Sequence, residues 1–261
     1  MIALLTDFGL ADTYVAQMKA VIWRHLPATP IIDLTHEIPA FDVWTGAWQL
    51  ASGFRWLPPG SVTVAIVDPG VGTERRILVV EAGGRFLLAP DNGLLTLVLQ
   101  EHGVKNVAVL RSDWPKRDEV APTFHGRDLF APAAARVLAS GGIASVVQAS
   151  AHAELPPMML PTMPLREGKG WQATVLAVDR FGNIITNLGP QHCAGWRTIM
   201  CEPERGETVY FPVGRKFSDS APGRWIAYLG SGGKFELARN QANAAANLQL
   251  KPGATVTLLP V

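Results

Sequence analysis

The chain has little cysteine, little charge and no long apolar run. Its two cysteines, Cys193 and Cys201, are too few for a disulfide framework and too far apart for a C-x-x-C zinc or redox site, so both are expected to be ordinary buried or half-buried thiols. Charged residues make up 17% and the formal net charge is +1, which gives no electrostatic attraction toward nucleic acid or anionic lipid. No apolar stretch approaches the length of a membrane span. A small, uncharged or zwitterionic ligand fits this balance better.

The sequence also lacks a targeting leader. Met1 runs directly into a predicted strand, with no basic, apolar and small-residue segment before it. We therefore expect a soluble, cytoplasmic protein. With 48% hydrophobic residues, a chain of 261 residues can form one large domain or two modest ones, each with a real core. The sequence contains no internal repeat and no low-complexity tract.

Short apolar strands and amphipathic helices alternate over residues 1–150. A pair of strands joined by Gly83-Gly84 is expected to form a hairpin. The alternation predicts an α/β domain with a mainly parallel, layered sheet. The expected strands are Ile2–Leu5, Ile31–Leu34, Ser61–Val67, Ile77–Glu81, Arg85–Ala89 and Val107–Leu110, and the expected helices are 14–22, Val43–Trp56, Asn92–His102 and Asp128–Ala139.

A proline-rich stretch, residues 151–168, follows this domain and is interpreted as a linker, because its four closely spaced prolines cannot sit in a continuous helix or a central strand. Residues 169–261 then carry short β segments separated by turn residues. This spacing predicts a smaller all-β domain, a barrel or a sandwich, with one small helix near Gln241–Asn247. The expected strands are Gln172–Val178, Asn183–Asn187, Thr198–Cys201, Glu207–Phe211, Trp225–Tyr228, Lys234–Ala238 and Thr255–Leu259.

The segment A-I-V-D-P-G-V-G-T-E-R-R, residues 65–76, carries the most informative polar pattern. An apolar strand delivers Asp68 into a glycine-rich turn, and Arg75 and Arg76 follow in the same loop. Open α/β sheets place ligand crevices at the carboxyl ends of strands, so a carboxylate and a guanidinium here indicate a polar active site. A structural turn with a local ion pair would leave the same pattern.

Two further motifs of the first domain contain candidate site residues. Asp7 ends the first strand in T-D-F-G, where it is either a turn aspartate or a carboxylate that accepts two hydrogen bonds from a ribose diol. In T-F-H-G-R-D, His125 and Arg127 flank Gly126 just before a helix. His125 is either a structural histidine or a catalytic one, and Asp128 best fits a helix cap.

The second domain has two motifs of its own. V-D-R-F-G-N-I-I-T-N, from residue 178 to residue 187, places Asp179 and Phe181 beside Gly182 and Asn183 at a strand break. The requirements of a hairpin turn explain Gly182 and Asn183 but do not explain Asp179 and Phe181. L-G-S-G-G, residues 229–233, is a glycine loop that would let the backbone approach a ligand carboxylate, and it lacks the lysine and serine of a P-loop.

Taken together, these motifs resemble the S-adenosylmethionine hydroxide adenosyltransferase family, the adenosine-forming S-adenosylmethionine hydrolases related to fluorinating and chlorinating enzymes. The resemblance covers essentially the whole chain. It implies an N-terminal α/β domain, a C-terminal β domain and a homotrimer with ligand sites between neighbouring subunits. The motifs that carry it, in one order, are T-D-F-G, D-x-Y-V-x-x-M-K, V-D-P-G-V-G-T-E-R-R, P-D-N-G-L-L, T-F-H-G-R-D and D-x-F-G-N.

The resemblance also implies roles for individual residues. Asp7 corresponds to the ligand of the ribose diol. The fluorinating relatives have an arginine directly after the serine of the glycine loop, where this chain has Gly232, and the halogenating relatives lack the hydrolytic triad; both differences argue against halogenation. The remaining positions are the triad, Asp68, Arg75 and His125; the residues at the methionine and adenine ends, Asp179, Asn183 and Ser231; and other pocket-lining residues, Phe181, Phe217 and Arg239.

The implied reaction is hydrolysis of S-adenosyl-L-methionine to adenosine and L-methionine, with water attacking the ribose C5′ atom. Methionine leaves the sulfonium as a neutral group and needs no acid, whereas water, with a pKa of about 15.7, is a poor nucleophile. Asp68 and His125 would orient and deprotonate this water while Arg75 stabilises the developing hydroxide. No metal or other cofactor is expected, because alignment by binding can supply up to roughly 7 to 11 kcal/mol.

Two alternatives remain open at this point. One is a metal-dependent phosphatase or nucleotidase in which Asp7, Asp68, Asp91 and His125 hold a cation, although Arg75 and its neighbour would compete for Asp68. The other is a non-catalytic protein that binds S-adenosylmethionine or adenosine without converting it.

Overall fold

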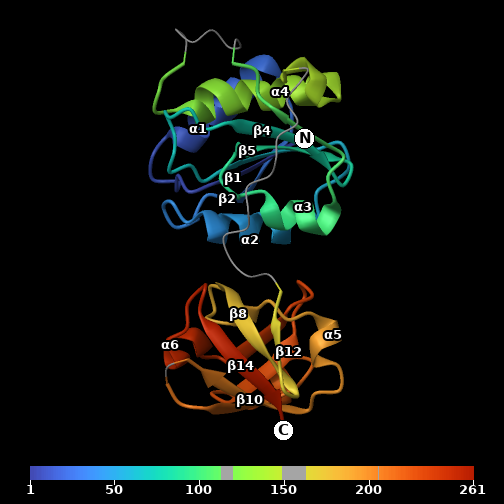
Figure 1. Ribbon diagram of the computed structural model, residues 1–261. Helices are drawn as coiled ribbons and strands as arrows, with labels where there is room; N and C mark the ends of the chain where they lie inside the picture. The colour runs from blue at the N-terminus through green and yellow to red at the C-terminus, as the bar shows by residue number, and fades with distance from the viewer. Residues whose placement is uncertain (113–119, 149–162, 205) are drawn as a thin grey trace. The chain divides into compact units, whose positions relative to one another are not determined.

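The computed structural model of the chain describes residues 1–112, 120–148, 163–204 and 206–261. Its contacts divide the chain into two compact units, Met1–Met159 and Leu160–Val261 (Figure 1). Most of the predicted linker lies outside the described residues, so its boundaries stay predictions. Among the described residues, no helix has both the length and the apolar character needed to cross a membrane.

Within the described residues, the N-terminal unit has a six-stranded sheet of mixed direction. Its strands are β1 (Ile2–Thr6), β2 (Ile31–Thr35), β3 (Val62–Ile66), β4 (Ile77–Ala82), β5 (Arg85–Pro90) and β6 (Asn106–Val109). They lie in the order β2-β1-β3-β5-β4-β6. The first four in this order pair in parallel, whereas β4 runs antiparallel to both β5 and β6. The predicted hairpin is confirmed, but the prediction of a mainly parallel sheet is not, because β4 is reversed between two neighbours.

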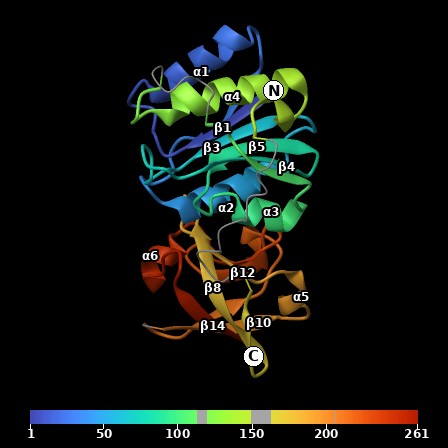
Figure 2. The same ribbon diagram turned by 45° about the horizontal axis from the view of Figure 1, so that its top comes forward.

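Helices cover both faces of this sheet. They are α1 (Tyr14–His25), α2 (Val43–Phe54), α3 (Thr96–His102), α4 (Ala131–Ser140), the π-helix η2 (Gly126–Phe130) and the short 3₁₀ helix η3 (Ile143–Ser145). Helices α1 and α4 lie on one face, and α2 and α3 lie on the other (Figure 1, Figure 2). Because both faces are covered, the central strands β1 and β3 are buried along their whole length, which explains why their sequences are almost entirely apolar.

Two predicted helix starts in this unit are wrong. Helix α3 begins at Thr96 and not at Asn92, because the Asn92 amide donates to the Val67 carbonyl (2.8 Å) and accepts the Leu94 N–H (3.3 Å), which holds a turn. Asp128 is not a helix cap, since it lies inside η2. Its carboxylate accepts the backbone N–H of Ala121 (2.9 Å), which precedes the helix.

The C-terminal unit has a second sheet of eight strands among its described residues. They are β7 (Leu165–Glu167), β8 (Gly170–Val178), β9 (Ile184–Thr186), β10 (Thr198–Pro203), β11 (Val209–Pro212), β12 (Trp225–Leu229), β13 (Phe235–Arg239) and β14 (Thr255–Pro260). The order is β11-β10-β14-β8-β9-β13-β12, with β7 beside β8, and these strand pairs run antiparallel.

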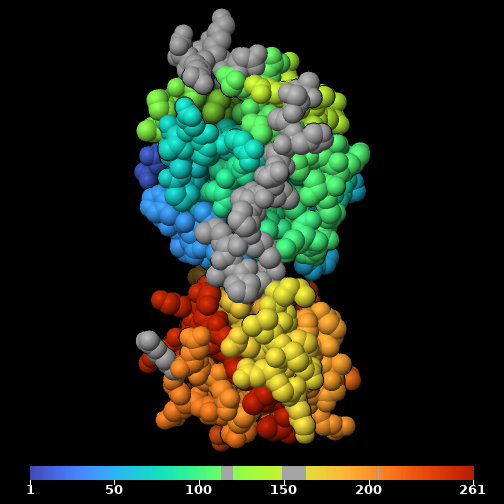
Figure 3. Space-filling view, in the orientation of Figure 1, coloured from blue at the N-terminus to red at the C-terminus, as the bar shows by residue number. Residues whose placement is uncertain are grey.

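This second sheet curls into a nearly closed barrel around its own core. The Gly214 N–H, just after β11, donates to the Ala227 carbonyl of β12 (2.9 Å) and brings the two ends of the sheet together. The predicted all-β domain is therefore confirmed as barrel-like. Strand β7 begins within the predicted linker and lies on the surface of this unit (Figure 3). The short helices of the C-terminal unit are α5 (Pro190–Cys193), η4 (Phe217–Asp219) and α6 (Ala244–Leu248).

Both cysteines are free thiols, as expected. Cys193 is half-buried and Cys201 is buried in the barrel core. Burial raises the pKa of the Cys201 thiol to about 12. A thiol with so high a pKa forms little thiolate, so we expect it to be unreactive.

Candidate active site

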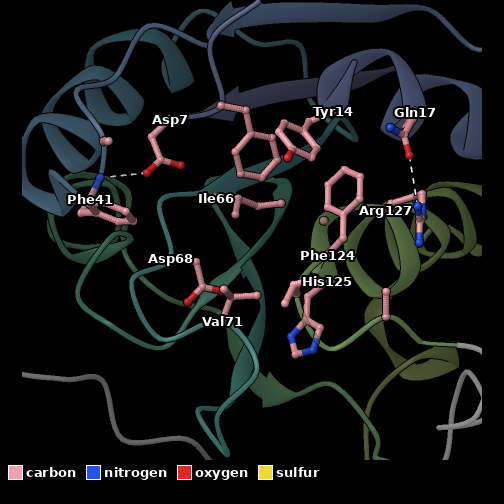
Figure 4. Close-up of a pocket in the computed structure, with 15 residues that line it drawn as sticks. Asp7, Tyr14, Gln17, Phe41, Ile66, Asp68, Val71, Phe124, His125 and Arg127 are labelled. Carbon is pink, nitrogen blue, oxygen red and sulfur yellow. Dashed lines mark hydrogen bonds between the residues drawn. The ribbon is translucent and has the colours of Figure 1, made fainter. Parts of the chain in front are cut away.

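A cavity of about 610 Å³ in the N-terminal unit lies where β1 and β3 end (Figure 4). Asp7 follows β1 and Asp68 follows β3, and both line this cavity. Because β1 and β3 are neighbouring parallel strands, their carboxyl ends meet at one edge of the sheet. The volume suits a small molecule of nucleoside size or somewhat larger.

Arg75 joins Asp68 to His125, two residues that line the cavity. The Arg75 Nε atom lies 3.0 and 2.8 Å from the two carboxylate oxygens of Asp68, and Arg75 Nη2 also contacts Oδ2. The same Nη2 lies 2.9 Å from Nδ1 of His125. The side chains of Asp68 and Arg75 are only 6% and 12% exposed, so solvent screens this ion pair poorly. The structure thus brings together the three residues of the predicted triad from a strand end, a loop and the start of a helix.

The contact with Arg75 fixes the protonation of His125. A guanidinium only donates, so Nδ1 of His125 must accept, and the proton of the neutral ring is on Nε2. Burial, and after it the positive charge of Arg75, hold the pKa of His125 below its ordinary value of 6.5, against the opposing effect of Asp68 and Asp128. The imidazole is therefore neutral at neutral pH and offers its Nε2–H as a donor.

Asp7 is held at the cavity by the backbone of Phe41. Its Oδ2 atom accepts the Phe41 N–H at 2.9 Å (Figure 4). Phe41 has a φ of +68°, a left-handed conformation that costs a bulky residue energy, and its side chain is 70% exposed. Sequence reasoning missed Phe41, because nothing in its local pattern predicts that a loop 34 residues after Asp7 returns to it.

A buried histidine supports the loop that carries Asp7. His36, which is 3% exposed, contacts the hydroxyl of Thr6 through Nδ1 (2.8 Å), and the same hydroxyl accepts the Phe8 N–H (3.2 Å). On its other side, Nε2 lies 3.1 Å from Asp33, which pairs with Lys19 at 2.7 Å. These contacts fix the backbone on both sides of Asp7.

Aromatic rings form a wall of the cavity. Phe8, Tyr14 and Phe124 meet edge to face, with ring centroids 5.1 to 6.1 Å apart. Gly126 lies against them, since a Cβ atom there would come within 3.2 to 3.3 Å of Met18, Phe124 and Phe8. A larger residue between His125 and Arg127 would have to displace these side chains by a few tenths of an ångström, so glycine fits closely against this wall.

The alternative of a metal site finds no support. Arg75 holds Asp68, and Arg76 donates from Nε to Asp91 at 2.7 Å. Among the described residues, no three histidine, cysteine, aspartate or glutamate side chains are grouped so that they could hold a metal ion. Arginine pairs occupy the two carboxylates that a cation would need.

In the C-terminal unit, the turn between β8 and β9 brings Asp179 and Asn183 together. Asp179 Oδ1 accepts the N–H groups of Phe181 (2.9 Å) and Asn183 (2.8 Å), and Oδ2 accepts from the Asn183 side chain (2.7 Å). These bonds order the turn and leave the Phe181 side chain 76% exposed. The turn therefore presents an aromatic ring next to a fixed carboxylate.

The other predicted residues of this unit are more widely spread. Ser231 lies in the exposed turn between β12 and β13, whereas Arg239 ends β13 at the opposite end of that hairpin. Arg239 donates to the Gly223 carbonyl (2.8 Å) and to Asn247 (2.9 Å), so much of its guanidinium is used within the domain. The structure does not bring these two residues together.

Phe217 and two residues that sequence reasoning missed form a cluster near Asp179. Phe217, 41% exposed, packs against the ring of Tyr228 with centroids 5.1 Å apart. Tyr228 hydrogen-bonds the neighbouring Glu236 across the β12–β13 pair. Burial raises the pKa of both Tyr228 and Glu236. The charge and the hydrogen bond of Glu236 raise the pKa of Tyr228 further, and the charge of Asp179 adds to the rise of both. Their positions follow from strand register, which no local motif encodes.

Comparison with known proteins places both units of the chain. Residues 2–147 match the SAM hydroxide adenosyltransferase N-terminal domain, and residues 173–257 match the C-terminal domain of the same family. An (R)-S-adenosyl-L-methionine hydrolase from Thermus thermophilus is 40% identical over 98% of both chains. A fluorinase from Actinoplanes sp. is 28% identical over 99% of this chain and 97% of its own. The crystal structure of an uncharacterized conserved protein from Thermotoga maritima has a TM-score of 0.89 at 31% identity, covering 99% of this chain and all of that one.

Proposed function

Because the chain belongs to the SAM hydroxide adenosyltransferase family, we propose that its cavity binds S-adenosyl-L-methionine and positions a water molecule against it. The protein is an S-adenosyl-L-methionine hydrolase that releases adenosine and L-methionine. The observation that carries this proposal is the contact of one guanidinium, that of Arg75, with both Asp68 and His125. With these two side chains held in place, the Asp68 carboxylate can accept from one water molecule and Nε2–H of His125 can donate to it, at the wall of a cavity of suitable size.

In this mechanism the water lies between the Asp68 carboxylate and Nε2–H of His125. Asp68 accepts a proton from the water as the oxygen attacks C5′, the bond from C5′ to sulfur breaks, and methionine leaves with the bonding electron pair. Arg75 orients both side chains and stabilises the negative charge that develops on the water oxygen. The proton is then released to solvent, so that one water and one S-adenosylmethionine give adenosine, methionine and one proton.

Product analysis in isotopically labelled water tests this function. The purified full-length protein is incubated with S-adenosyl-L-methionine in H₂¹⁸O with excess chelator. We expect equal amounts of adenosine and methionine, with ¹⁸O in the adenosine 5′-hydroxyl. Loss of turnover that a divalent ion restores would support the metal-dependent alternative. If ligand binds without product, the protein is a binding protein only.

The pH dependence follows from the lowered pKa of His125. Its neutral form is present at pH 7 and persists below the ordinary value of 6.5, so kcat/KM should be level near neutrality. As the pH falls through the lowered pKa, protonation of Nδ1 breaks the contact with Arg75 and kcat/KM should drop. Rates measured from about pH 5 to about pH 9 check this. An increase of kcat/KM toward acid pH would contradict it.

Asp7 is proposed to bind the ribose diol. Its Oδ2 atom already accepts one N–H, which fixes the carboxylate so that its remaining lone pairs face a ligand. Hydrogen bonds to a charged group contribute about 1.5 to 3 kcal/mol, so Asp7→Ala should weaken adenosine binding roughly 10- to 100-fold. Calorimetry with adenosine measures this effect. The variant should no longer prefer adenosine to 2′,3′-dideoxyadenosine, and an undiminished preference would place the diol elsewhere.

A cytoplasmic homotrimer with active sites at subunit interfaces is part of the proposal. For the interface, the support is the exposure of apolar side chains around the cavity, with Phe41, Tyr14 and Val71 70%, 46% and 38% exposed. Such a cluster is typical of a surface that another chain covers. Light scattering coupled to gel filtration should give three times the chain mass, and a monomer that turns over substrate would refute the shared site.

A further inference from the structure

No role proposed above uses the motif P-D-N-G, residues 90–93, which begins at the last residue of β5. Its four residues are not among those that line the cavity. The third of them, Asn92, nevertheless contacts the backbone at the end of β3, the strand that delivers Asp68 to the cavity. This contact connects a residue outside the cavity to the predicted triad.

Asn92 lies at a break in the pairing of β3 with β5, two parallel neighbours in the sheet (Figure 2). The Ser61 carbonyl accepts the Phe86 N–H at the start of this pair (2.9 Å), and because carbonyl directions alternate along a strand, the Val67 carbonyl faces β5 as well. At this end β5 finishes with Pro90, which has no N–H to donate. The Val67 carbonyl therefore needs a donor that the strand itself does not supply.

The side chain of Asn92 is that donor. Its Nδ2 atom donates to the Val67 carbonyl at 2.8 Å, and its Oδ1 atom accepts the Leu94 N–H at 3.3 Å. A carbonyl only accepts and an N–H only donates, so both contacts require the same orientation of the amide. The backbone N–H of Asn92 is bonded to the Pro90 carbonyl (3.0 Å), which leaves the side chain to bind Val67.

Packing restrains both partners of the Asn92 amide. Val67 and Leu94 are fully buried, and both side chains lie against Gly46 of α2. A Cβ atom on this glycine would come within 2.9 Å of the Val67 side chain and 2.8 Å of the Leu94 side chain. The amide thus joins two backbone segments whose side chains have little room to move in the core.

The bond to Val67 acts on the backbone of Asp68. The Val67 carbonyl and the Asp68 N–H belong to one peptide plane, so a hydrogen bond to this carbonyl restrains the rotation of that plane. On the other side of β3, the Asp7 N–H donates to the Ile66 carbonyl at 3.3 Å. The backbone that leads into Asp68 is therefore held from the side of β1 and from the side of β5. Its carboxylate is only 6% exposed and is bonded to Arg75.

Resting on the function proposed above, we propose that Asn92 is a positioning residue, whose bond to the Val67 carbonyl directs the Asp68 carboxylate toward the attacking water. A displacement of about 1 Å at a reacting group can lower a rate about 100-fold. Loss of the bond should therefore lower kcat roughly 10- to 100-fold. Adenosine should bind nearly as well as in the parent, because the contact of Asp7 with Phe41 is retained.

The first test replaces Asn92 with aspartate, which can still accept the Leu94 N–H and keep the turn but cannot donate to Val67. We expect kcat to fall roughly 10- to 100-fold while the Kd of adenosine, measured by calorimetry, changes less than about threefold. Asn92→Ala, which adds no charge, should show the same separation. Asn106→Asp is the matched control, since Asn106 donates to the side chain of Glu81 at the surface and should keep the parental kcat.

A double-mutant cycle distinguishes positioning from a general effect on the fold. Single-turnover rates, with the enzyme in excess, are compared for the parent, Asn92→Ala, Asp68→Asn and the double variant. If Asn92 acts through the Asp68 carboxylate, Asn92→Ala should lower the parental rate but lower the rate of Asp68→Asn much less. A purely structural role would lower both rates by the same factor. Thermal unfolding shows which variants are folded, and Asn92→Asp replaces Asn92→Ala in the cycle if the alanine variant is not.

The outcomes separate this inference from the proposed function. A parental kcat in a folded Asn92 variant, equal losses in the two backgrounds, or a loss of adenosine affinity as large as the loss of kcat overturns the positioning role while the hydrolase stands. Release of no adenosine by the parent refutes the hydrolase itself. If Asp68→Asn is too slow for the cycle, the comparison of kcat with the Kd of adenosine decides.

Discussion

Replacing Asp68 with asparagine is expected to lower the rate of adenosine release by at least ~100-fold, the lower end of what acid and base groups contribute. The change keeps the shape of the side chain but removes the acceptor for the proton of the water. Binding of adenosine should change much less, because Asp68 faces the water and not the diol. Single-turnover rates and calorimetry with adenosine, measured on the same preparation, separate the two effects.

The Asp68 variant needs a control for stability. Removing one partner of a poorly solvated ion pair leaves the Arg75 charge unpaired and costs about 3 to 5 kcal/mol. Thermal unfolding should therefore be measured alongside activity. Asp91→Asn is the matched control, since Asp91 pairs with Arg76, whose side chain is 47% exposed and does not line the cavity. Parental activity in a folded Asp68→Asn would refute the role of Asp68.

Many elements of the fold could be predicted because their sequences are locally unambiguous. The apolar residues at Ile2–Leu5 and Ser61–Val67 predict strands, and the structure confirms strands there as β1 and β3. Gly83-Gly84 between two apolar runs predicts the hairpin of β4 and β5. The position of β4 between β5 and β6, which makes both of its pairings antiparallel, could not be predicted, because the order of strands in a sheet is set only by the tertiary structure.

The candidate site also contains residues that a local motif predicts and residues that it cannot predict. Asp68 and Arg75 are seven residues apart in one loop, so a local motif suffices to pair them, and the resemblance added His125, fifty residues further along. Phe41 and His36 were missed because their contacts to the loop around Asp7 span 34 and 30 residues with no motif of their own. Long-range backbone contacts of this kind leave no periodic pattern in a single sequence.

The prediction that Asp128 caps a helix is wrong for a different reason. An aspartate before an alanine-rich segment is a standard helix-start signal, yet here the helix begins earlier, as the π-helix η2. The carboxylate instead binds Arg127 and the backbone of Ala121. A side chain that local rules assign to capping thus orients a cation of the cavity, which is where such rules fail most often.

Replacing His125 with asparagine is expected to cause the second large loss of rate. The variant tests whether the imidazole acts as a hydrogen-bond donor or only fills space. The Oδ1 atom of asparagine is placed to accept from Arg75 as Nδ1 of His125 does, but no group remains at the position of Nε2. We expect at least a ~100-fold loss of hydrolysis, with the fold and the Asp68–Arg75 pair intact.

The pH profile of His125→Asn tests whether His125 causes the fall of kcat/KM at acid pH. If the acidic fall of kcat/KM in the parent comes from His125, the residual activity of His125→Asn should no longer fall in that range, because asparagine does not titrate. His102→Asn is the matched control, since His102 packs on the ring of Phe54 away from the cavity and should leave both rate and profile unchanged. An acidic fall that persists in His125→Asn would assign the titration to another group, and a parental rate would remove His125 from the mechanism.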